Sequence, residues 1–241
     1  MPETPPLSDD DIHQRLTEAI VDQRLLPGTK LVEDRLGEAF GVSRTRIRQV
    51  LIRLAQEQVV TLQPNKGASI AEPGVDEAHE VFEARRVIEA VLVQHFVDRA
   101  TPADLKALAD CIAAEEAARK AGDTATVLRQ SGRFHLLLAE TAGHRTFATF
   151  LRKLVSRTSL ILMRYAPRHG AAGPRGGCRC EDHRGLLTAL RGARSGRLPV
   201  AVAMQRMTDH LAHLEASLCW EDNAQHASRD LATLLRPATR R

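Results

Sequence analysis

The chain has 241 residues, of which 43% are hydrophobic and only 3% aromatic. This composition suits a globular protein with one or two domains whose cores are mainly aliphatic, which favours packed helices. No run of about 18 apolar residues exists, so we expect no membrane-spanning helix and no membrane partner. Residues 1–6 lack the basic and apolar regions of a signal peptide, and the four scattered cysteines do not form a disulfide pattern. We therefore expect a cytoplasmic protein.

The formal net charge is +4, but it is unevenly distributed. Residues 1–72 contain nine Lys/Arg and eleven Asp/Glu, a net charge of −2. The positive excess lies between Arg164 and Arg197. An argument for nucleic-acid binding must therefore rest on local pattern and not on total charge.

The N-terminal part predicts three helices. After a flexible tail at residues 1–8, apolar residues at helical spacing from Ile12 to Ile20 indicate a helix that Pro27-Gly28 ends. A short helix from about Val32 to Phe40 ends at Gly41, a residue suited to a left-handed turn. Ser43 can then cap a third helix that runs to about Glu57.

A small β-hairpin is expected after these helices. Two short apolar runs, residues 59–62 and 68–71, flank the turn Pro64-Asn65-Lys66-Gly67. The order of helix, helix, turn, helix and hairpin is that of a winged helix-turn-helix, which binds DNA. We therefore expect residues 9–72 to form a DNA-binding domain.

The rest of the chain reads as helical. Residues 73–75 form a linker, and residues 76–222 form an all-helical domain for effector binding and dimerisation. We expect its helices near residues 76–98, 102–121, 124–142, 144–166, 180–194 and 198–222, with Pro102 and Pro199 in first turns. Residues 168–177 should form a flexible loop and residues 223–241 a polar tail. The expected fold class is mainly α.

The third helix has the features of a recognition helix. Arg44 and Arg48 are four residues apart and share a face, whereas Arg46 and Arg53 lie on other parts of the exposed side. Residues 35–66 carry six Lys/Arg and two Asp/Glu, a local charge of +4. The expected DNA contacts are Arg35, Ser43, Arg44, Thr45, Arg46, Arg48, Lys66 and Gly67. The alternative is an ordinary solvated basic helix.

Three histidines stand beside apolar stripes of the helical domain: His135, His183 and His210. Imidazoles that project inward from three helices can bind one divalent metal, such as Zn²⁺ or Ni²⁺. Spacing alone does not bring them together, and unrelated core histidines are the other interpretation.

The N-terminal residues resemble the winged helix-turn-helix of GntR-family regulators. The resemblance is carried by Pro27-Gly28, Leu31, Glu33, Leu36, Gly41-Val42-Ser43-Arg44-Thr45, Arg48, Leu51, Leu54 and Pro64-Asn65-Lys66-Gly67-Ala68. It implies DNA contacts by Ser43, Arg44, Thr45, Arg48 and Gly67. The chain departs from the family pattern at Arg46, where proline is usual, at Gln49-Val50, where Glu-Ala is usual, and at Gln58, where glycine is usual. Arg46 is an expected additional DNA contact that would alter the preferred operator.

The helical part resembles the FCD domain of the FadR subfamily, in its shorter, six-helix VanR-like version. Residues 83–89, 134–143, 183 and 207–210 carry this second resemblance. It implies a metal bound by one aspartate and three histidines, with a carboxylate effector completing the shell. His135, His183 and His210 match the histidines, but Ser131 stands where the aspartate is expected.

Three outcomes follow from Ser131. The three histidines alone hold the ion, Asp182 or Asp209 substitutes for the missing carboxylate, or the histidines bind an anion without metal. The resemblance also implies that Arg85 faces the effector; an ordinary ion pair with Glu89 is the alternative. The expected effector-binding residues are thus Arg85, Ser131, His135, His183 and His210. A second metal cluster at Cys178, Cys180 and His183 lacks a standard spacing.

The sequence therefore predicts a regulator and not an enzyme. We expect a repressor that binds a palindromic double-stranded operator as a homodimer and responds to a small carboxylate. The alternatives are a metal-responsive regulator, a non-specific architectural DNA binder, and a helical metal-dependent hydrolase that uses the three histidines.

Overall fold

The computed structural model describes residues 7–166, 180–220 and 235, and it divides into two compact units. The described residues of the first unit are 7–72 and 235, and those of the second unit are 73–166 and 180–220. The expected loop at residues 168–177 lies outside the described residues. So do the expected tails at residues 1–8 and 223–241, apart from residues 7, 8 and 235.

Helix α1 of the first unit spans Asp9–Val21. Ser8 begins it with a capping box: its hydroxyl accepts from the backbone N–H of Asp11, and the Asp11 carboxylate accepts from the backbone N–H of Ser8. The helix ends six residues before Pro27, so the prediction that Pro27-Gly28 ends it was wrong. The chain instead turns at Gln23, whose φ of 57° lies in the left-handed region.

The helix-turn-helix consists of α2, Glu33–Phe40, and α3, Arg44–Gln56. Gly41 ends α2 with a φ of 66°, as its position after the apolar stripe predicts. Ser43 caps α3 by accepting a hydrogen bond from the backbone N–H of Arg46. The apolar faces of these helices and α1 meet in one core, which includes Ile12, Leu16, Leu36, Ile47, Leu51 and Leu54, all without exposed surface.

The wing is a three-stranded antiparallel sheet in the order β1-β3-β2. The expected hairpin is present as β2, Val60–Gln63, and β3, Gly67–Ile70, with Gln63 opposite Gly67. The third strand, β1 at Lys30–Leu31, was not predicted. It contains only two residues, and its partners Ser69 and Ala68 lie almost forty positions along the chain, so no local pattern marks it.

The second unit is all-helical in its described residues. Its helices are α4 Val75–Arg99, α5 Pro102–Lys120, α6 Thr124–Ala142, α7 Arg145–Tyr165, α8 Cys180–Arg194 and α9 Val200–Ala216. These six agree closely with the predicted ranges and confirm the mainly α fold class. Pro102 lies in the first turn as predicted, but Pro199 is the residue before the first turn, and α9 ends at Ala216, earlier than expected.

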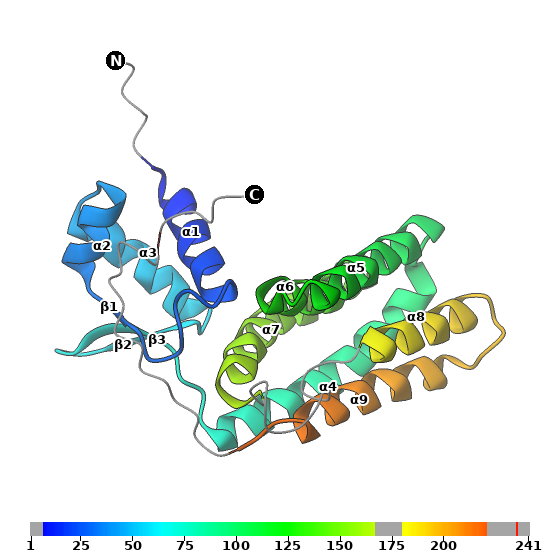
Figure 1. Cartoon of the computed structure of the whole chain (residues 1–241). Coiled ribbons are helices and arrows are strands. Elements are labelled where there is room, and N and C mark those ends of the chain that lie inside the picture. The colour runs from blue at the N-terminus through cyan, green and yellow to red at the C-terminus, as the bar shows by residue number, and fades with distance from the viewer. Residues whose placement is uncertain (1–6, 167–179, 221–234, 236–241) are drawn as a thin grey trace. The chain divides into compact units, whose positions relative to one another are not determined.

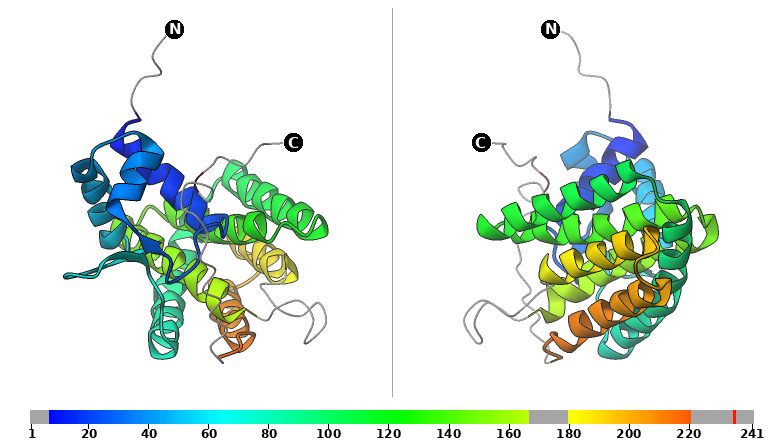
Figure 2. Two further views of the ribbon diagram at one scale, coloured as in Figure 1. Left: turned by 60° about the vertical axis from the view of Figure 1, so that its left-hand side comes forward. Right: turned by 90° about the vertical axis from the view of Figure 1, so that its right-hand side faces the viewer.

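The long helix α4 organises this unit (Figure 1). It packs along α9 and also contacts α6 and α7, whereas α5 packs on α6 and α8. Figure 2 shows the same helices from two further sides. Apolar side chains from all six of these helices, α4 to α9, form the larger core cluster. The same packing brings together five buried polar side chains, one each from α4, α5, α6, α8 and α9: Glu89, Glu115, His135, His183 and His210.

Among the described helices, none combines the length and the hydropathy that a bilayer crossing requires.

Candidate nucleic-acid interface and metal centre

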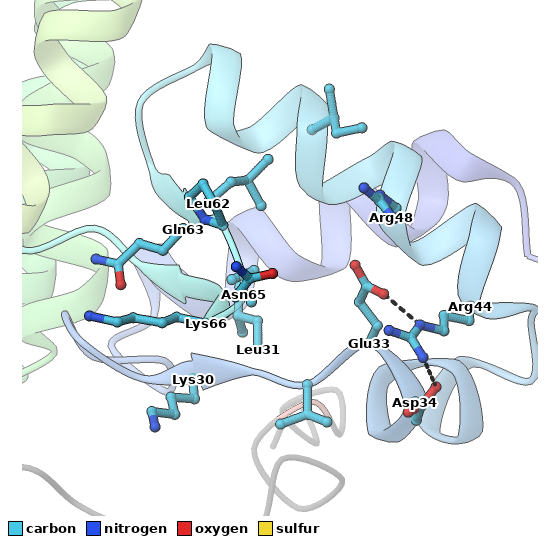
Figure 3. Close-up of a pocket in the computed structure, with 15 residues that line it drawn as sticks. Lys30, Leu31, Glu33, Asp34, Arg44, Arg48, Leu62, Gln63, Asn65 and Lys66 are labelled. Atoms are coloured by element: carbon cyan, nitrogen blue, oxygen red, sulfur yellow. Dashed lines mark hydrogen bonds and ion pairs between the residues drawn. The ribbon is translucent and has the colours of Figure 1, made fainter.

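The N-terminal end of α3 lies beside the wing and borders a groove of about 700 Å³. Arg44 and Arg48 line it from α3, and Lys66 and Gly67 line it from the wing (Figure 3). The two arginines therefore share a face, as their spacing predicts. A groove that combines the start of a recognition helix with a basic wing has the donor pattern that DNA phosphates and base edges accept.

Carboxylates from α2 hold the guanidinium of Arg44. Its Nε donates to Oε2 of Glu33 at 2.7 Å, and its Nη1 lies 3.6 Å from Oδ1 of Asp34. The hydrogen bond to Glu33 raises the pKa of Arg44, and the negative charges of Asp34 and Glu33 add to this effect. Arg48 has a different environment, because it makes no ion pair with any described residue.

Two other arginines of α3 are directed to α1. The guanidinium of Arg46 binds Asp9 through Nε at 2.8 Å and donates to the backbone oxygen of Leu7. Arg53 pairs with Asp10 at 2.8 Å. Arg46, which takes the place of the usual proline, therefore links the recognition helix to the start of α1 in this structure. Its expected DNA contact stays a prediction.

The wing tip depends on two left-handed residues. Asn65 has a φ of 61° and Gly67 a φ of 82°, and the backbone N–H of Lys66 bonds to the oxygen of Gln63. Nothing lies within 4 Å of a Cβ built on Gly67, so the tip is open for another molecule to approach. Arg35 on α2 is also exposed. Within the described residues, neither Arg35 nor Lys66 has an ion pair.

The second unit brings His135, His183 and His210 together, although they come from α6, α8 and α9. One ring nitrogen of each lies within 4.8 Å of the others, and the Nε2 atoms of His135 and His210 are 3.4 Å apart. Zinc–nitrogen bonds of about 2.1 Å in tetrahedral geometry place two ligand atoms roughly 3.4 Å apart. The predicted convergence of the histidines is confirmed.

Each of the three imidazoles has a carboxylate on its Nδ1 side. Nδ1 of His135 lies 2.5 Å from Glu89, and Nδ1 of His183 lies 2.7 Å from Glu115. Nδ1 of His210 lies 3.9 Å from Asp182. An ionised carboxylate only accepts hydrogen bonds, so Nδ1 of His135 and Nδ1 of His183 donate to Glu89 and Glu115, which leaves their Nε2 atoms as the candidate ligand atoms.

The electrostatics of this cluster favour a cation at its centre. Burial lowers the pKa of His135 to about 3, despite the opposing effect of Glu89, so this imidazole is neutral near pH 7. Burial alone would raise the pKa of Glu89, but Arg85 and His135 outweigh it and hold that pKa at about 2. Inward-facing lone pairs repel one another unless a cation lies between them. The donor set therefore fits a divalent metal ion.

Arg85 belongs to the same network. Its Nε donates to Oε1 of Glu89 at 2.7 Å, and its Nη1 donates to Thr158 at 3.2 Å. Arg85 is 2% exposed and Glu89 is 0% exposed. The ion pair predicted as the alternative role of Arg85 is therefore present. The third nitrogen of Arg85, Nη2, is buried without a hydrogen-bond partner among the described residues, which is costly unless a ligand accepts from it.

The remaining expected ligands have distinct positions. Ser131 is buried on α6, one turn before His135. Asp209 is exposed and accepts a hydrogen bond from Gln205, so it does not substitute for the missing aspartate. Asp182 contacts the outer nitrogen of His210, which makes it a supporting residue. The side chains of Cys178 and Cys180 lie outside the described residues.

Sequence reasoning missed the carboxylates that support the histidines. Glu115 lies on the buried stripe of α5 together with Leu108, Ile112 and Ala118. Glu89 likewise lies on the buried stripe of α4 and was considered only as a partner of Arg85. A glutamate at such a position needs a buried partner, and this signal could have identified both residues.

Comparison with known protein families agrees with both units. Residues 9–70 match the model of bacterial regulatory proteins of the gntR family, and residues 80–213 match the FCD domain model. The chain belongs to the GntR family and carries an FCD domain. Both resemblances drawn from the sequence are thereby confirmed.

Relatives of this GntR-family chain include transcriptional regulators. It is 27% identical over 114 residues to the HTH-type transcriptional regulator McbR of Escherichia coli, covering 47% of this chain and 52% of McbR. The match to YdhC of Bacillus subtilis covers 62% of that protein, so the chain spans only part of the length of these relatives. A third relative, named as an L-lactate dehydrogenase operon regulatory protein of E. coli, is 25% identical over 90% of each chain.

Solved structures show the same fold. A GntR transcriptional regulator from Rhodococcus sp. RHA1 aligns with a TM-score of 0.73 and 24% identity, covering 86% of this chain and 95% of its own. The structure of E. coli McbR aligns with a TM-score of 0.66 and 22% identity, covering 86% and 98%. The winged helix-turn-helix and the helical unit therefore occur together in other proteins.

Proposed function

We propose that this protein is a transcriptional repressor that binds a palindromic operator as a homodimer. The observation that carries the proposal is the capped start of α3 beside a groove lined by Arg44, Arg48 and Lys66. In a dimer, two such helices enter successive major grooves, so the operator is an inverted repeat. The family match and the regulator names of the relatives support this function.

In vitro selection from random duplex DNA tests the proposal. The enriched sites should be inverted repeats with half-sites one helical turn apart, about 10 bp, or a multiple of it. Light scattering should give twice the mass of the chain, and a footprint should cover both half-sites. A selection that enriches no sequence, or a site without two-fold symmetry bound by one chain, would contradict the proposal.

The effector in this proposal is a small carboxylate bound at the metal centre of the FCD domain. His135, His183 and His210 would hold a divalent ion such as Zn²⁺ or Ni²⁺, and Ser131 lies one turn from His135. When bound, the ion would supply positive charge and open coordination positions for carboxylate oxygens. Arg85 supports this assignment, because its buried Nη2 has no hydrogen-bond partner among the described residues and is a donor suited to an anion.

The effector site is tested by loading and thermal shift. Metal content is measured on protein that was stripped with a chelator and then dialysed against Zn²⁺ or Ni²⁺. A panel of small organic acids is then added to the stripped and loaded forms, beginning with L-lactate because a relative is named for a lactate dehydrogenase operon. An acid that raises the melting temperature only of the loaded form supports the site. If no metal binds, an acid that binds the stripped form through Arg85 identifies a metal-free pocket.

A metal-responsive regulator is the second proposal, and the buried three-histidine cluster favours it. In that case Zn²⁺ or Ni²⁺ alone changes the affinity for the selected DNA, with no organic acid present. A hydrolase is less well supported. The carboxylates nearest the histidines, Glu89 and Glu115, face Nδ1 atoms, so neither is placed as a general base for a water at the centre.

A further inference from the structure

Arg44 is exposed at the DNA-reading surface, yet two carboxylates fix its guanidinium. Its side chain is 66% exposed, whereas that of Glu33 is only 20% exposed. Glu33 and Asp34 form the first turn of α2, where the helix dipole favours negative charge. The position of these carboxylates is therefore set by α2 itself, and Figure 3 shows both directed at Arg44.

The contact is also specific in its geometry. Glu33 accepts from Nε, the nitrogen nearest the chain, at 2.7 Å, while Asp34 lies at the longer distance of 3.6 Å from Nη1. A carboxylate on Nε leaves the two terminal nitrogens of the guanidinium without a hydrogen bond to Glu33, and the 3.6 Å from Nη1 to Asp34 is longer than a hydrogen bond. Two terminal donors are the arrangement with which arginine reads O6 and N7 of guanine.

Arg48 provides the contrast within the same groove. It lines the groove beside Arg44 but has no ion pair with any described residue. No carboxylate of a described residue therefore competes with a phosphate for Arg48 in an ion pair. Glu33 and Asp34 partly offset the charge of Arg44, so Arg44 attracts a nearby DNA phosphate less strongly than Arg48 does.

We propose that Glu33 is a specificity-determining residue that holds Arg44 end-on for a guanine edge and reduces its attraction to phosphates. The proposal rests on the DNA-binding function above and goes beyond it, because it assigns Glu33 a role in discrimination. Phosphate contacts give affinity without sequence information, whereas base contacts give specificity. An acidic residue at the reading surface thus improves selectivity by lowering non-specific binding.

The test compares Glu33→Gln with Glu38→Gln in the full chain. Glu38 is exposed on the same short helix and makes no ion pair with any described residue, so both variants remove one negative charge from α2. Fluorescence anisotropy measures binding to the site obtained by in vitro selection and to a scrambled duplex of equal length, at several salt concentrations. Circular dichroism confirms that each variant is folded.

Glu33→Gln should steepen the salt dependence on scrambled DNA by about one phosphate contact per protomer, a slope change of about 1.8 for the dimer. At 0.1 M salt that change corresponds to roughly a sixtyfold gain in the non-specific affinity of the dimer. The ratio of selected to scrambled binding should fall roughly ten- to a hundredfold, because a guanine contact is lost as the phosphate contact is gained. Glu38→Gln should change neither the slope nor the ratio to this extent.

Arg44→Ala supplies the internal control. In that background, Glu33→Gln should affect binding no more than Glu38→Gln does, because the residue on which Glu33 acts is absent. If Glu33→Gln weakens binding to both duplexes equally and leaves the slope of the salt dependence unchanged, Glu33 only supports the fold. That result would overturn the inference. An unchanged ratio would overturn it too. Failure of the wild-type chain to distinguish the two duplexes would instead refute the proposed function.

Discussion

Replacing Glu89 by leucine should destabilise the second unit, because it leaves the charge of Arg85 buried and unpaired. Glu89 is fully buried, and it binds both Nε of Arg85 and Nδ1 of His135. Removing one member of a buried ion pair typically costs about 3–5 kcal/mol of unfolding free energy. Since a domain is stable by only about 5–15 kcal/mol, this is a large fraction of the total.

The double variant Arg85→Met, Glu89→Leu separates the ion pair from the rest of the network. It removes both charges, so the remaining cost is the unsatisfied Nδ1 of His135, about 1–3 kcal/mol. The double variant should therefore be more stable than Glu89→Leu alone, and far more stable than the sum of the single changes predicts.

Urea titration with a chelator present measures these differences without a contribution from bound metal. Trp220 is the one tryptophan of the chain, and its ring lies 5.3 Å from that of Tyr165 in the second unit, so its fluorescence follows this unit. A loss below about 1 kcal/mol in Glu89→Leu would refute the reasoning. So would a double variant as unstable as the two single variants added together.

Three further predictions concern metal, pH and backbone strain. Zn²⁺ at one hundred times its dissociation constant should stabilise the stripped protein by about 2.7 kcal/mol, and His210→Ala should abolish most of this gain in a thermal shift measurement. Thr101→Ala should cost about 1 kcal/mol at neutral pH, because Thr101 caps α5. The side-chain hydrogen bond from Thr101 lowers the pKa of Asp104. The stability that Asp104 contributes is therefore present above the unfolded carboxyl pKa of about 3.9 and is lost as the pH falls through the lower folded value. Urea titrations from pH 3 to 6 should show that the unfolding free energy of the variant depends less on acid pH. Gln58 has a φ of 62°, in the left-handed region that favours glycine, so Gln58→Gly should stabilise the first unit by up to about 1 kcal/mol in denaturation experiments. Destabilisation would show that the side-chain contacts of Gln58 outweigh the backbone strain.

Local signals in the sequence identify most helices and their ends. Gly41 and Ser43 mark the turn of the helix-turn-helix because one adopts a left-handed conformation and the other accepts a capping hydrogen bond. Strand β1 carries no such signal, since it exists only through pairing with β3. Elements that depend on a distant partner for their hydrogen bonds cannot be recognised from their own residues.

The same distinction applies to the metal centre. Spacing places each histidine beside an apolar stripe, but their convergence depends on how α6, α8 and α9 pack, which spacing does not determine. The supporting carboxylates Glu89 and Glu115 are also contributed by separate helices. Their positions on buried stripes do predict that each needs a polar partner, so part of the network is accessible to sequence reasoning.

Charge in the first unit shows why a total is a poor guide to DNA binding. Residues 1–72 have a net charge of −2, yet their carboxylates are not spread evenly. Arg46 and Arg53 are seven residues apart and so lie on one side of α3, where Asp9 and Asp10 neutralise them. On the groove side, Arg48 forms no ion pair with any described residue, so its positive charge is not neutralised in this way. A net acidic unit therefore still offers DNA a positive edge, because Asp9 and Asp10 bind arginines on the α1 side of α3 and leave Arg48 and Lys66 on the groove side without an ion pair to any described residue.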